Sequence, residues 1–230
     1  MTLIKQKKSI IPSCDVGSLE KLSQLVKSTC KVNGIGAYKI GFELVIQFGM
    51  GKVIKVIRKH TKLPIIYDHQ KAGTDIPDMG LKFMNACKGA DAVIIFPQAG
   101  PETETAWIKA AQQSNMQIIV GGEMTHKGYL KSDNGYLEDD APKKIYEIAA
   151  SLGVSDFVVP GNKVDKCVEY NKLIKTKIKN PVYYSPGLVT QGGNISDLAK
   201  KLDSWHAIVG RAIYEAKDMK KAAEEMAKEL

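Results

Sequence analysis

Short runs of apolar and β-branched residues alternate with longer amphipathic segments along the chain, and this alternation constrains the fold more than any other feature. Strands that are covered on both faces read as brief apolar runs, and repeated strand and helix units build a parallel sheet. The predicted strands are Ser9–Ser13, Ala37–Ile40, Pro64–Asp68, Ala92–Phe96, Gln117–Val120, Asp156–Val159, Pro181–Ser185 and Ala207–Val209.

The segments between these runs have the periodicity of amphipathic helices. In the first of them, Leu19, Leu22 and Leu25 fall on one face, while Lys21 and Lys27 fall elsewhere. The predicted helices are Ser18–Thr29, Glu43–Lys59, Pro77–Lys88, Glu102–Ser114, Ala141–Leu152, Val164–Lys175 and Tyr214–Leu230. Eight strands without a composition break or a low-complexity linker favour a closed (β/α)8 TIM barrel of the α/β class over an open doubly wound sheet. Residues 1–230 are therefore expected to form a single domain.

The composition excludes several classes of protein. The chain is 44% hydrophobic and 25% charged, which is ordinary for a globular protein and argues against disorder. No apolar run approaches the roughly 20 residues that span a bilayer, and the N-terminal segment lacks the pattern of a secretory signal. The cysteines, Cys14, Cys30, Cys87 and Cys167, are scattered without CxxC spacing, so reduced thiols and a cytoplasmic location are expected.

The formal net charge of +8 is compatible with a nucleic-acid surface or with a site for a phosphorylated substrate. Many lysines recur along predicted helices, as Lys172, Lys175 and Lys179 do, and no stacking aromatic residues are interleaved with them. An RNA-binding protein or an inactive barrel scaffold is one alternative, which predicts salt-sensitive oligonucleotide binding without turnover. Because acids and lysines gather at strand ends, an enzyme without nucleic-acid or membrane partners is favoured.

Active sites of (β/α)8 barrels lie at the C-terminal ends of the strands and in the loops that follow, which we call strand exits. Exits one to three hold Asp15, Lys39, Asp68, Lys71 and Asp75. A single carboxylate there is commonly a helix cap or an ion-pair partner. Five ionisable groups at successive exits instead predict an alternating charge network, because buried charges are costly unless they are paired. The sequence therefore predicts an active site centred on residues 68–75.

A second group of residues follows the last two predicted strands. It consists of Ser185-Pro186-Gly187, Gln191-Gly192-Gly193 and Gly210-Arg211. Glycines allow backbone N–H groups to approach a phosphate, and a cation balances its charge. Either glycine cluster alone would be compatible with an ordinary turn, but phosphate sites of TIM barrels usually occupy these two loops. Their joint position predicts a phosphate site.

Together these exits form an ordered set of motifs: Lys39-Ile40-Gly41, then Asp68 with Lys71 and Asp75-Ile76-Pro77, then the two glycine loops and Ile208-Val209-Gly210-Arg211. From about Ile11 to about Ala216 the chain resembles the orotidine 5′-monophosphate decarboxylase family, particularly its short archaeal form. The resemblance implies a homodimeric barrel that converts orotidine 5′-monophosphate to uridine 5′-monophosphate and carbon dioxide in pyrimidine biosynthesis, with neither metal nor organic cofactor.

The resemblance also implies roles for the matching residues. Asp15 would bind ribose hydroxyls, Lys39 would bridge the ribose and the charge network, and Asp68 would face the substrate carboxylate. Lys71 would protonate C6 of the pyrimidine, and Asp75 would reach the site of the neighbouring subunit. The other implied substrate-binding residues are Thr125 at the pyrimidine, Gln191 and Arg211 at the phosphate, and Pro160 and Gly210 at their strand exits.

Two features depart from the pattern of the family. The family motif is usually D-x-K-x-x-D, whereas two residues separate Asp68 from Lys71 and three separate Lys71 from Asp75. This two-residue expansion is interpreted as a loop bulge that still returns both side chains to the cavity. Met79 stands where the short archaeal form has a threonine near the base, so that contact is expected to be lost or moved.

The alternative among enzymes is another phosphosugar enzyme of the same barrel superfamily, dependent on a metal ion. Examples are 3-keto-gulonate-phosphate decarboxylases, hexulose-phosphate synthases and pentulose-phosphate epimerases. His69, beside Asp68, is compatible with that interpretation, but no second histidine lies at ligand spacing from it. A metal site is therefore not expected, and activity in the presence of a chelator separates the two hypotheses.

Overall fold

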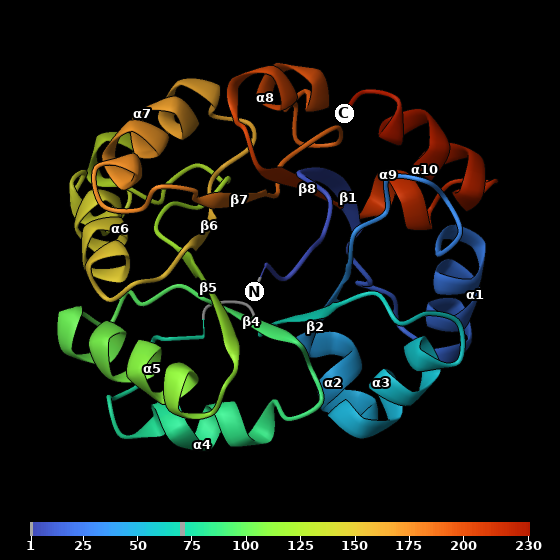
Figure 1. The fold of residues 1–230 in the computed structure, drawn as a ribbon, viewed down its shortest axis with the longest axis horizontal. Helices are drawn as coiled ribbons and strands as arrows, with labels where there is room; N and C mark the ends of the chain where they lie inside the picture. The colour runs from blue at the N-terminus through green and yellow to red at the C-terminus, as the bar shows by residue number, and fades with distance from the viewer. Residues whose placement is uncertain (1, 70–71) are drawn as a thin grey trace.

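The computed structural model describes residues 2–69 and 72–230, and within them eight parallel strands form a barrel with helices around it (Figure 1). The strands are hydrogen-bonded in the order β1-β8-β7-β6-β5-β4-β3-β2. β1 and β2 close the ring, because Ser13 bridges Lys39 and the Cys14 N–H donates to the Lys39 carbonyl at 2.7 Å. The predicted TIM barrel is confirmed by this topology.

The strands agree closely with the sequence prediction, since their ends differ from it by at most two residues. They are β1 Lys8–Pro12, β2 Tyr38–Gly41, β3 Ile65–Asp68, β4 Ala92–Ile95, β5 Gln117–Gly121, β6 Asp156–Val158, β7 Val182–Ser185 and β8 Trp205–Val209. The helices in the described residues are α1 Leu19–Thr29, α2 Phe42–Phe48, α3 Met50–Arg58, α4 Met79–Ala86, α5 Pro101–Gln113, α6 Ala141–Ser151, α7 Val164–Lys175, α8 Ile195–Lys201, α9 Arg211–Tyr214 and α10 Met219–Ala227, with a short 3-10 turn, η1, at Lys131–Asp133.

The single helix predicted over Glu43–Lys59 is wrong, because Gly49 divides this segment into α2 and α3. Gly49 has φ 80° and ψ 143°, a backbone conformation that glycine adopts readily and that cannot continue a helix. A glycine inside a helical pattern is often tolerated, so the periodicity alone did not reveal the break.

Two further helix predictions are corrected near the C-terminus. The helix predicted over Tyr214–Leu230 is divided into α9 and α10, and Asp218 caps α10 by accepting the Lys221 N–H at 3.0 Å. The sequence prediction also lacked α8, which begins after Asn194. The Asn194 side chain accepts the Ser196 N–H at 2.8 Å, the usual bond of a helix N-cap.

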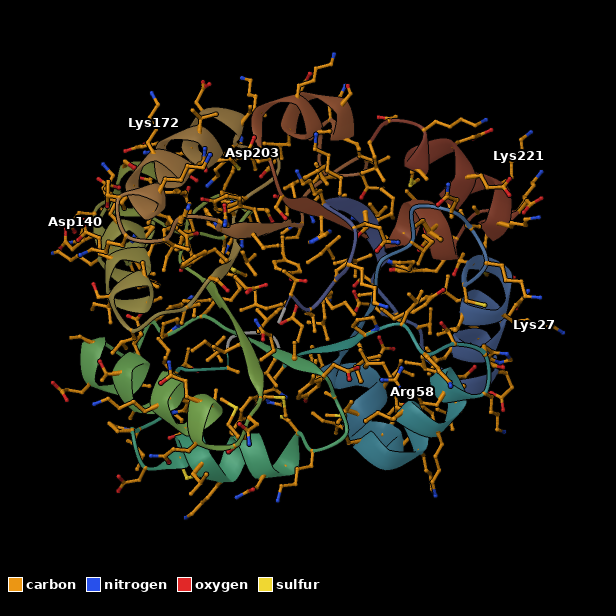
Figure 2. The ribbon with its side chains drawn as sticks, in the orientation of Figure 1. Lys27, Arg58, Asp140, Lys172, Asp203 and Lys221 are labelled. Atoms are coloured by element: carbon orange, nitrogen blue, oxygen red, sulfur yellow. The ribbon has the colours of Figure 1, made fainter. Side chains whose placement is uncertain are left out.

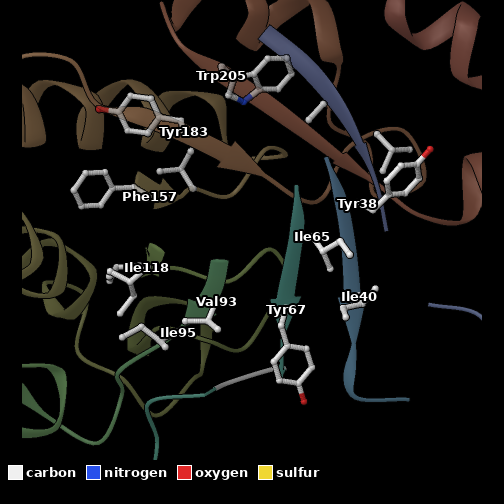
Figure 3. Packing of buried hydrophobic residues seen from close by; sticks show 14 of the residues in the cluster. Tyr38, Ile40, Ile65, Tyr67, Val93, Ile95, Ile118, Phe157, Tyr183 and Trp205 are labelled. Carbon is white, nitrogen blue, oxygen red and sulfur yellow. The ribbon is translucent and has the colours of Figure 1, made fainter. Parts of the chain in front are cut away.

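Buried apolar residues form two layers, one inside the barrel and one between strands and helices. Consecutive residues of a strand alternate between them, so that Ile10 belongs to the outer layer and Ile11 to the inner one. Figure 3 shows part of the outer layer, in which Val93, Phe157 and Tyr183 project from their strands. With both faces covered, the strands hold their C-terminal ends in fixed positions.

Charged side chains lie mainly on the outside of the ring. Lys27, Lys172 and Lys221 are exposed and project outward from α1, α7 and α10 (Figure 2). This placement matches the expectation that lysines cover solvated helix faces. Within residues 2–69 and 72–230, no helix is both long and apolar enough to cross a membrane.

Candidate active site

A cavity of about 240 Å³ opens where the strands end, and all eight strands or their following loops contribute to its wall. It lies where the sequence places the active site. Its described lining residues are Ser13, Asp15, Lys39, Asp68, Ile94, Phe96, Glu123, Met124, Thr125, Val158, Pro186, Gly187, Leu188, Thr190, Gln191, Ile208, Gly210, Arg211 and Tyr214.

Lys39 is the buried cation of this cavity and lies between two carboxylates. Only 4% of the residue is exposed, and its Nζ lies 3.2 Å from Asp68 Oδ2 and 3.6 Å from Asp15 Oδ1. Burial lowers the pKa of Lys39, but the charges of Asp68 and Asp15 outweigh that effect, so the pKa lies above its ordinary value. The structure thus brings three of the five predicted network residues together, with the lysine held as an ammonium.

The position of Asp15 depends on its immediate neighbours. Ser13 Oγ donates to Asp15 Oδ2 at 2.6 Å, which leaves Oδ1 directed at Lys39. Across the cavity wall, a Cβ at Gly41 would lie 2.8 Å from Asp15 Oδ1, closer than real Cβ atoms approach. The absence of a side chain at the end of β2 therefore makes room for this carboxylate.

The exits of β7 and β8 form another part of the cavity wall, and β8 is hydrogen-bonded to β1. Gln191, Gly210 and Arg211 line this part of the wall as predicted, and they are joined by Pro186 and Tyr214. The glycine loop after β7 closes on itself, because the Val189 N–H donates to the Gly193 carbonyl at 2.8 Å. A single cavity therefore contains a buried ammonium with its carboxylates and, in the same wall, an arginine beside glycine-rich backbone.

Thr125 also lines the cavity, at the exit of β5. Its carbonyl accepts a hydrogen bond from Asn162 Nδ2 at 3.0 Å, which ties the loop after β5 to the loop after β6. The backbone of Thr125 is thereby fixed where the residue lines the cavity.

Asp75 lies outside the cavity of its own chain, exposed at the start of the segment that leads into α4. Its Oδ1 accepts the Ile76 N–H at 2.7 Å, and its carbonyl accepts from Thr103 Oγ1 at 2.9 Å. Trp107 Nε1 donates to the next carbonyl, that of Ile76, at 3.1 Å. Two side chains of α5 therefore hold the backbone of this segment.

Pro160 is buried beside the cavity and is not among its described lining residues. Its carbonyl accepts from Cys167 Sγ at 3.2 Å and from the Lys163 N–H at 2.9 Å, so it anchors the start of α7. The proline that lines the cavity is Pro186. Met79, the other departure noted in the sequence, packs partly buried against the outer apolar layer.

Lys71 lies outside the described residues, as does Gln70. The described residues on either side are held next to the cavity. Asp68 ends β3, and the Ala72 carbonyl accepts the N–H of Phe96, a cavity residue, at 2.6 Å. Asp68 and Ala72, which flank residues 69–71, therefore both adjoin the cavity wall.

His69 contacts a tyrosine and does not belong to a group of metal-ligating side chains among the described residues. Its Nδ1 lies 2.5 Å from the hydroxyl of Tyr67. In the part of the chain that the structure describes, no three His, Cys, Asp or Glu side chains are grouped as a metal site would need.

Glu123 is a cavity residue that was not predicted from the sequence. It is only 2% exposed, accepts from Lys163 Nζ at 2.7 Å, and also accepts from the hydroxyl of Tyr170. Like Thr125, Glu123 follows β5 directly, so its position at a strand exit was a usable signal. Its partners are 40 and 47 residues away, so nothing local in the sequence revealed the buried pair.

Comparison with known proteins identifies one family. Residues 8–226 match the model of the Orotidine 5′-phosphate decarboxylase / HUMPS family. The chain is 31% identical over 211 residues to the orotidine 5′-phosphate decarboxylase of Methanococcus maripaludis, with 91% of each chain covered. It is 29% identical over 230 residues to that of Methanosarcina barkeri, covering 99% of this chain and 96% of the relative.

Solved structures show similarity to the same family. Orotidine 5′-monophosphate decarboxylase from Methanocaldococcus jannaschii, complexed with the inhibitor BMP, superposes with a TM-score of 0.84 at 27% sequence identity. The match covers 97% of this chain and 98% of that one. The similarity therefore extends over the whole barrel and includes every strand exit that forms the cavity.

Proposed function

Because the chain belongs to the Orotidine 5′-phosphate decarboxylase / HUMPS family, we propose that its barrel cavity converts orotidine 5′-monophosphate to uridine 5′-monophosphate and carbon dioxide in pyrimidine biosynthesis. The observation that carries this proposal is the pairing of Lys39 with Asp68 and Asp15 in the same cavity as Arg211. The buried charge network suits the reacting base and ribose, and the arginine beside glycine-rich backbone suits a phosphate. The reaction as proposed uses neither a metal nor an organic cofactor.

The chemical step breaks the bond between C6 of the pyrimidine and its carboxylate. Carbon dioxide leaves, the electron pair stays on C6, and the Lys71 ammonium donates a proton there. Fixed ammonium groups stabilise the developing negative charge in a site that excludes water. Asp68, which holds Lys39 in place, also faces the departing carboxylate, and its repulsion raises the energy of the bound substrate.

The remaining cavity residues bind parts of the substrate that do not react. Asp15 accepts from the ribose hydroxyls, Thr125 contacts the pyrimidine, and Gln191 and Arg211 hold the phosphate beside the Gly210 backbone. Binding energy gained at a remote phosphate positions the reacting base, so it contributes to the rate as well as to affinity. Pro186, rather than Pro160, is the cavity proline in this arrangement.

We propose further that two chains form a homodimer in which Asp75 reaches the cavity of the partner. Asp75 is exposed outside the cavity of its own chain, which supports this arrangement. Large apolar side chains are exposed on neighbouring elements: Ile76 is 60% exposed, Leu81 48% and Ile46 70%. Covering exposed apolar side chains such as these would favour association of two chains. A cytoplasmic location is proposed as well, supported by the four unpaired cysteine thiols.

An absorbance assay tests the function. Purified protein is mixed with orotidine 5′-monophosphate in excess EDTA, and loss of substrate absorbance is followed together with chromatographic detection of uridine 5′-monophosphate. Full turnover in EDTA is expected. Activity that disappears with EDTA and returns with Mg²⁺ would support a metal-dependent phosphosugar enzyme instead, and salt-sensitive oligonucleotide binding without turnover would support the scaffold alternative.

A further inference from the structure

The exit of β3 has a hydrogen bond on its outer side that spans Asp68. Tyr67 and His69 flank Asp68 in the sequence, and side chains alternate in direction along a strand. Asp68 lines the cavity, whereas Tyr67 belongs to the outer apolar layer and projects from β3 in Figure 3. His69 Nδ1 lies 2.5 Å from the Tyr67 hydroxyl, so the His69 ring turns to the same outer side. The bond therefore lies on the side of Asp68 that faces away from the cavity.

Phe83, on α4, packs against both of these rings. Its ring centroid lies 6.2 Å from that of Tyr67 and 5.9 Å from that of His69, which it meets edge-on at 68°. Phe83 also lies 5.0 Å from Trp107 of α5, between ring centroids. Trp107 Nε1 in turn donates to the Ile76 carbonyl at 3.1 Å. One group of aromatic side chains thus holds the chain at His69 and again at Ile76.

The place of this bond matters because Asp68 is the last residue of β3. It pairs with Gly41 of β2 and with Ile94 of β4, and the strand ladder ends there. A buried tyrosine hydroxyl needs a hydrogen-bond partner, but many groups could provide one. Here the partner is the residue directly after Asp68, so the bond restrains the backbone where the ladder no longer does. The 3.2 Å contact between Asp68 Oδ2 and Lys39 Nζ depends on that restraint.

We propose that His69 is a positioning residue for the reaction: its hydrogen bond with Tyr67 and its contact with Phe83 fix the direction in which Asp68 enters the cavity. The proposal rests on the decarboxylase function proposed above, in which Asp68 faces the departing carboxylate. His69 acts through Asp68 and does not itself touch the substrate, because its ring lies on the outer side of the strand exit.

Tyr67→Phe removes the hydroxyl and keeps the ring that packs against Phe83. Its kcat for orotidine 5′-monophosphate is expected to fall about 10- to 100-fold, the effect of a misplaced group at the reacting centre. KM and the affinity for uridine 5′-monophosphate should change less than about twofold, because the product lacks the carboxylate that Asp68 faces. Steady-state kinetics and titration calorimetry measure these quantities.

Tyr183→Phe is the matched control, because Tyr183 is also a buried strand tyrosine. Its hydroxyl donates to Asn171 Oδ1 at 3.0 Å and joins β7 to α7, away from the exit of β3. This variant is expected to lose a similar amount of thermal stability and to keep the wild-type kcat. Equal kcat values in Tyr67→Phe and Tyr183→Phe would overturn the proposal.

A double-mutant cycle identifies the bond. His69→Phe keeps an aromatic ring beside Phe83, lacks the ring nitrogen, and is expected to lose as much kcat as Tyr67→Phe. The double variant should be no slower than either single variant, because both changes remove the same bond. Additive losses, or wild-type kcat in His69→Phe, would mean that the bond does not position Asp68. A wild-type protein without turnover would instead reject the decarboxylase function, and this proposal with it.

Discussion

Thr103 Oγ1 donates to the backbone carbonyl of Asp75 at 2.9 Å, so α5 fixes the place from which Asp75 leaves the barrel. Thr103 is buried and Asp75 is exposed, and the bond joins the rigid helix layer to a residue proposed to act in another subunit. In the proposed dimer, the precision with which Asp75 reaches the partner's cavity would depend on that anchor.

Thr103→Val is therefore expected to lower kcat/KM for orotidine 5′-monophosphate about fivefold, the effect of losing one hydrogen bond of roughly 1 kcal/mol. Valine keeps the shape of threonine, so the thermal unfolding temperature should change little. Thr105→Val, on the same helix and partly exposed, is the matched control. Equal kinetics in the two variants would mean that the Thr103 hydroxyl does not position Asp75.

Lys39→Ala is expected to reduce uridine 5′-monophosphate formation by a factor of about 1,000 or more and to destabilise the fold. The variant leaves Asp68 and Asp15 without their shared cation, at a cost of roughly 2 kcal/mol given the partial exposure of Asp15. Urea unfolding measures this cost. Lys131→Ala removes an exposed ion pair with Glu138 and is expected to change the free energy of unfolding far less. Similar losses of unfolding free energy in both variants would mean that the buried ion pairs of Lys39 contribute no more than an exposed ion pair.

Lys71→Ala is expected to nearly eliminate turnover while leaving the fold and much of the ligand affinity intact. Lys71→Arg separates charge from proton transfer, since arginine keeps the positive charge but releases a proton far less readily. We expect the arginine variant to bind a product analogue normally and still turn over poorly. Wild-type rates in the alanine variant would exclude Lys71 as the proton donor.

Arg211→Ala is expected to raise KM for orotidine 5′-monophosphate about 10- to 100-fold, because a charge-assisted bond to phosphate is lost. The nucleoside orotidine, which lacks the phosphate, provides the control. Its slow decarboxylation should be the same in the variant and in the wild type. A fall in both rates would show that Arg211 acts on the reacting part of the substrate.

The stability of the chain should depend on pH through Glu104. Burial raises its folded pKa to about 8, above the ordinary 4.5, so its contribution is full below pH 4.5 and is lost as pH rises through 8. Relative to wild type, Glu104→Leu is therefore expected to become more stable by roughly 3 kcal/mol between pH 5 and pH 8. Chemical denaturation at a series of pH values measures the difference. A constant difference across that range would mean that Glu104 titrates normally.

The strands were predictable because each is buried on both faces and reads as a short apolar run. The helix boundaries were less predictable. The hydrophobic periodicity continues through Gly49, and only the backbone angle of that glycine reveals the break. α8 is short, and its Asn194 cap is a weak signal in a loop rich in glycine. Local sequence therefore specified the elements better than their ends.

The site was predictable where residues follow strands directly. Asp15, Lys39 and Asp68 meet because the ends of neighbouring parallel strands lie side by side. The position of a residue at a strand exit does not determine whether it faces the cavity. Pro160 was therefore predicted to bind substrate, although Pro186 lines the cavity. Pairs such as Glu123 and Lys163 join distant loops and become visible only when the barrel closes.

The exposure of Asp75 has a consequence for inheritance. In the proposed dimer, a chain with a defective Asp75 damages the site of its partner, whereas a chain with a defective Lys39 damages its own. Two inactive alleles of these kinds, expressed in one cell, would assemble mixed dimers in which one site has both defects and the other has none. Complementation between them would restore growth without pyrimidine, so geneticists would observe an allelic interaction within a single gene.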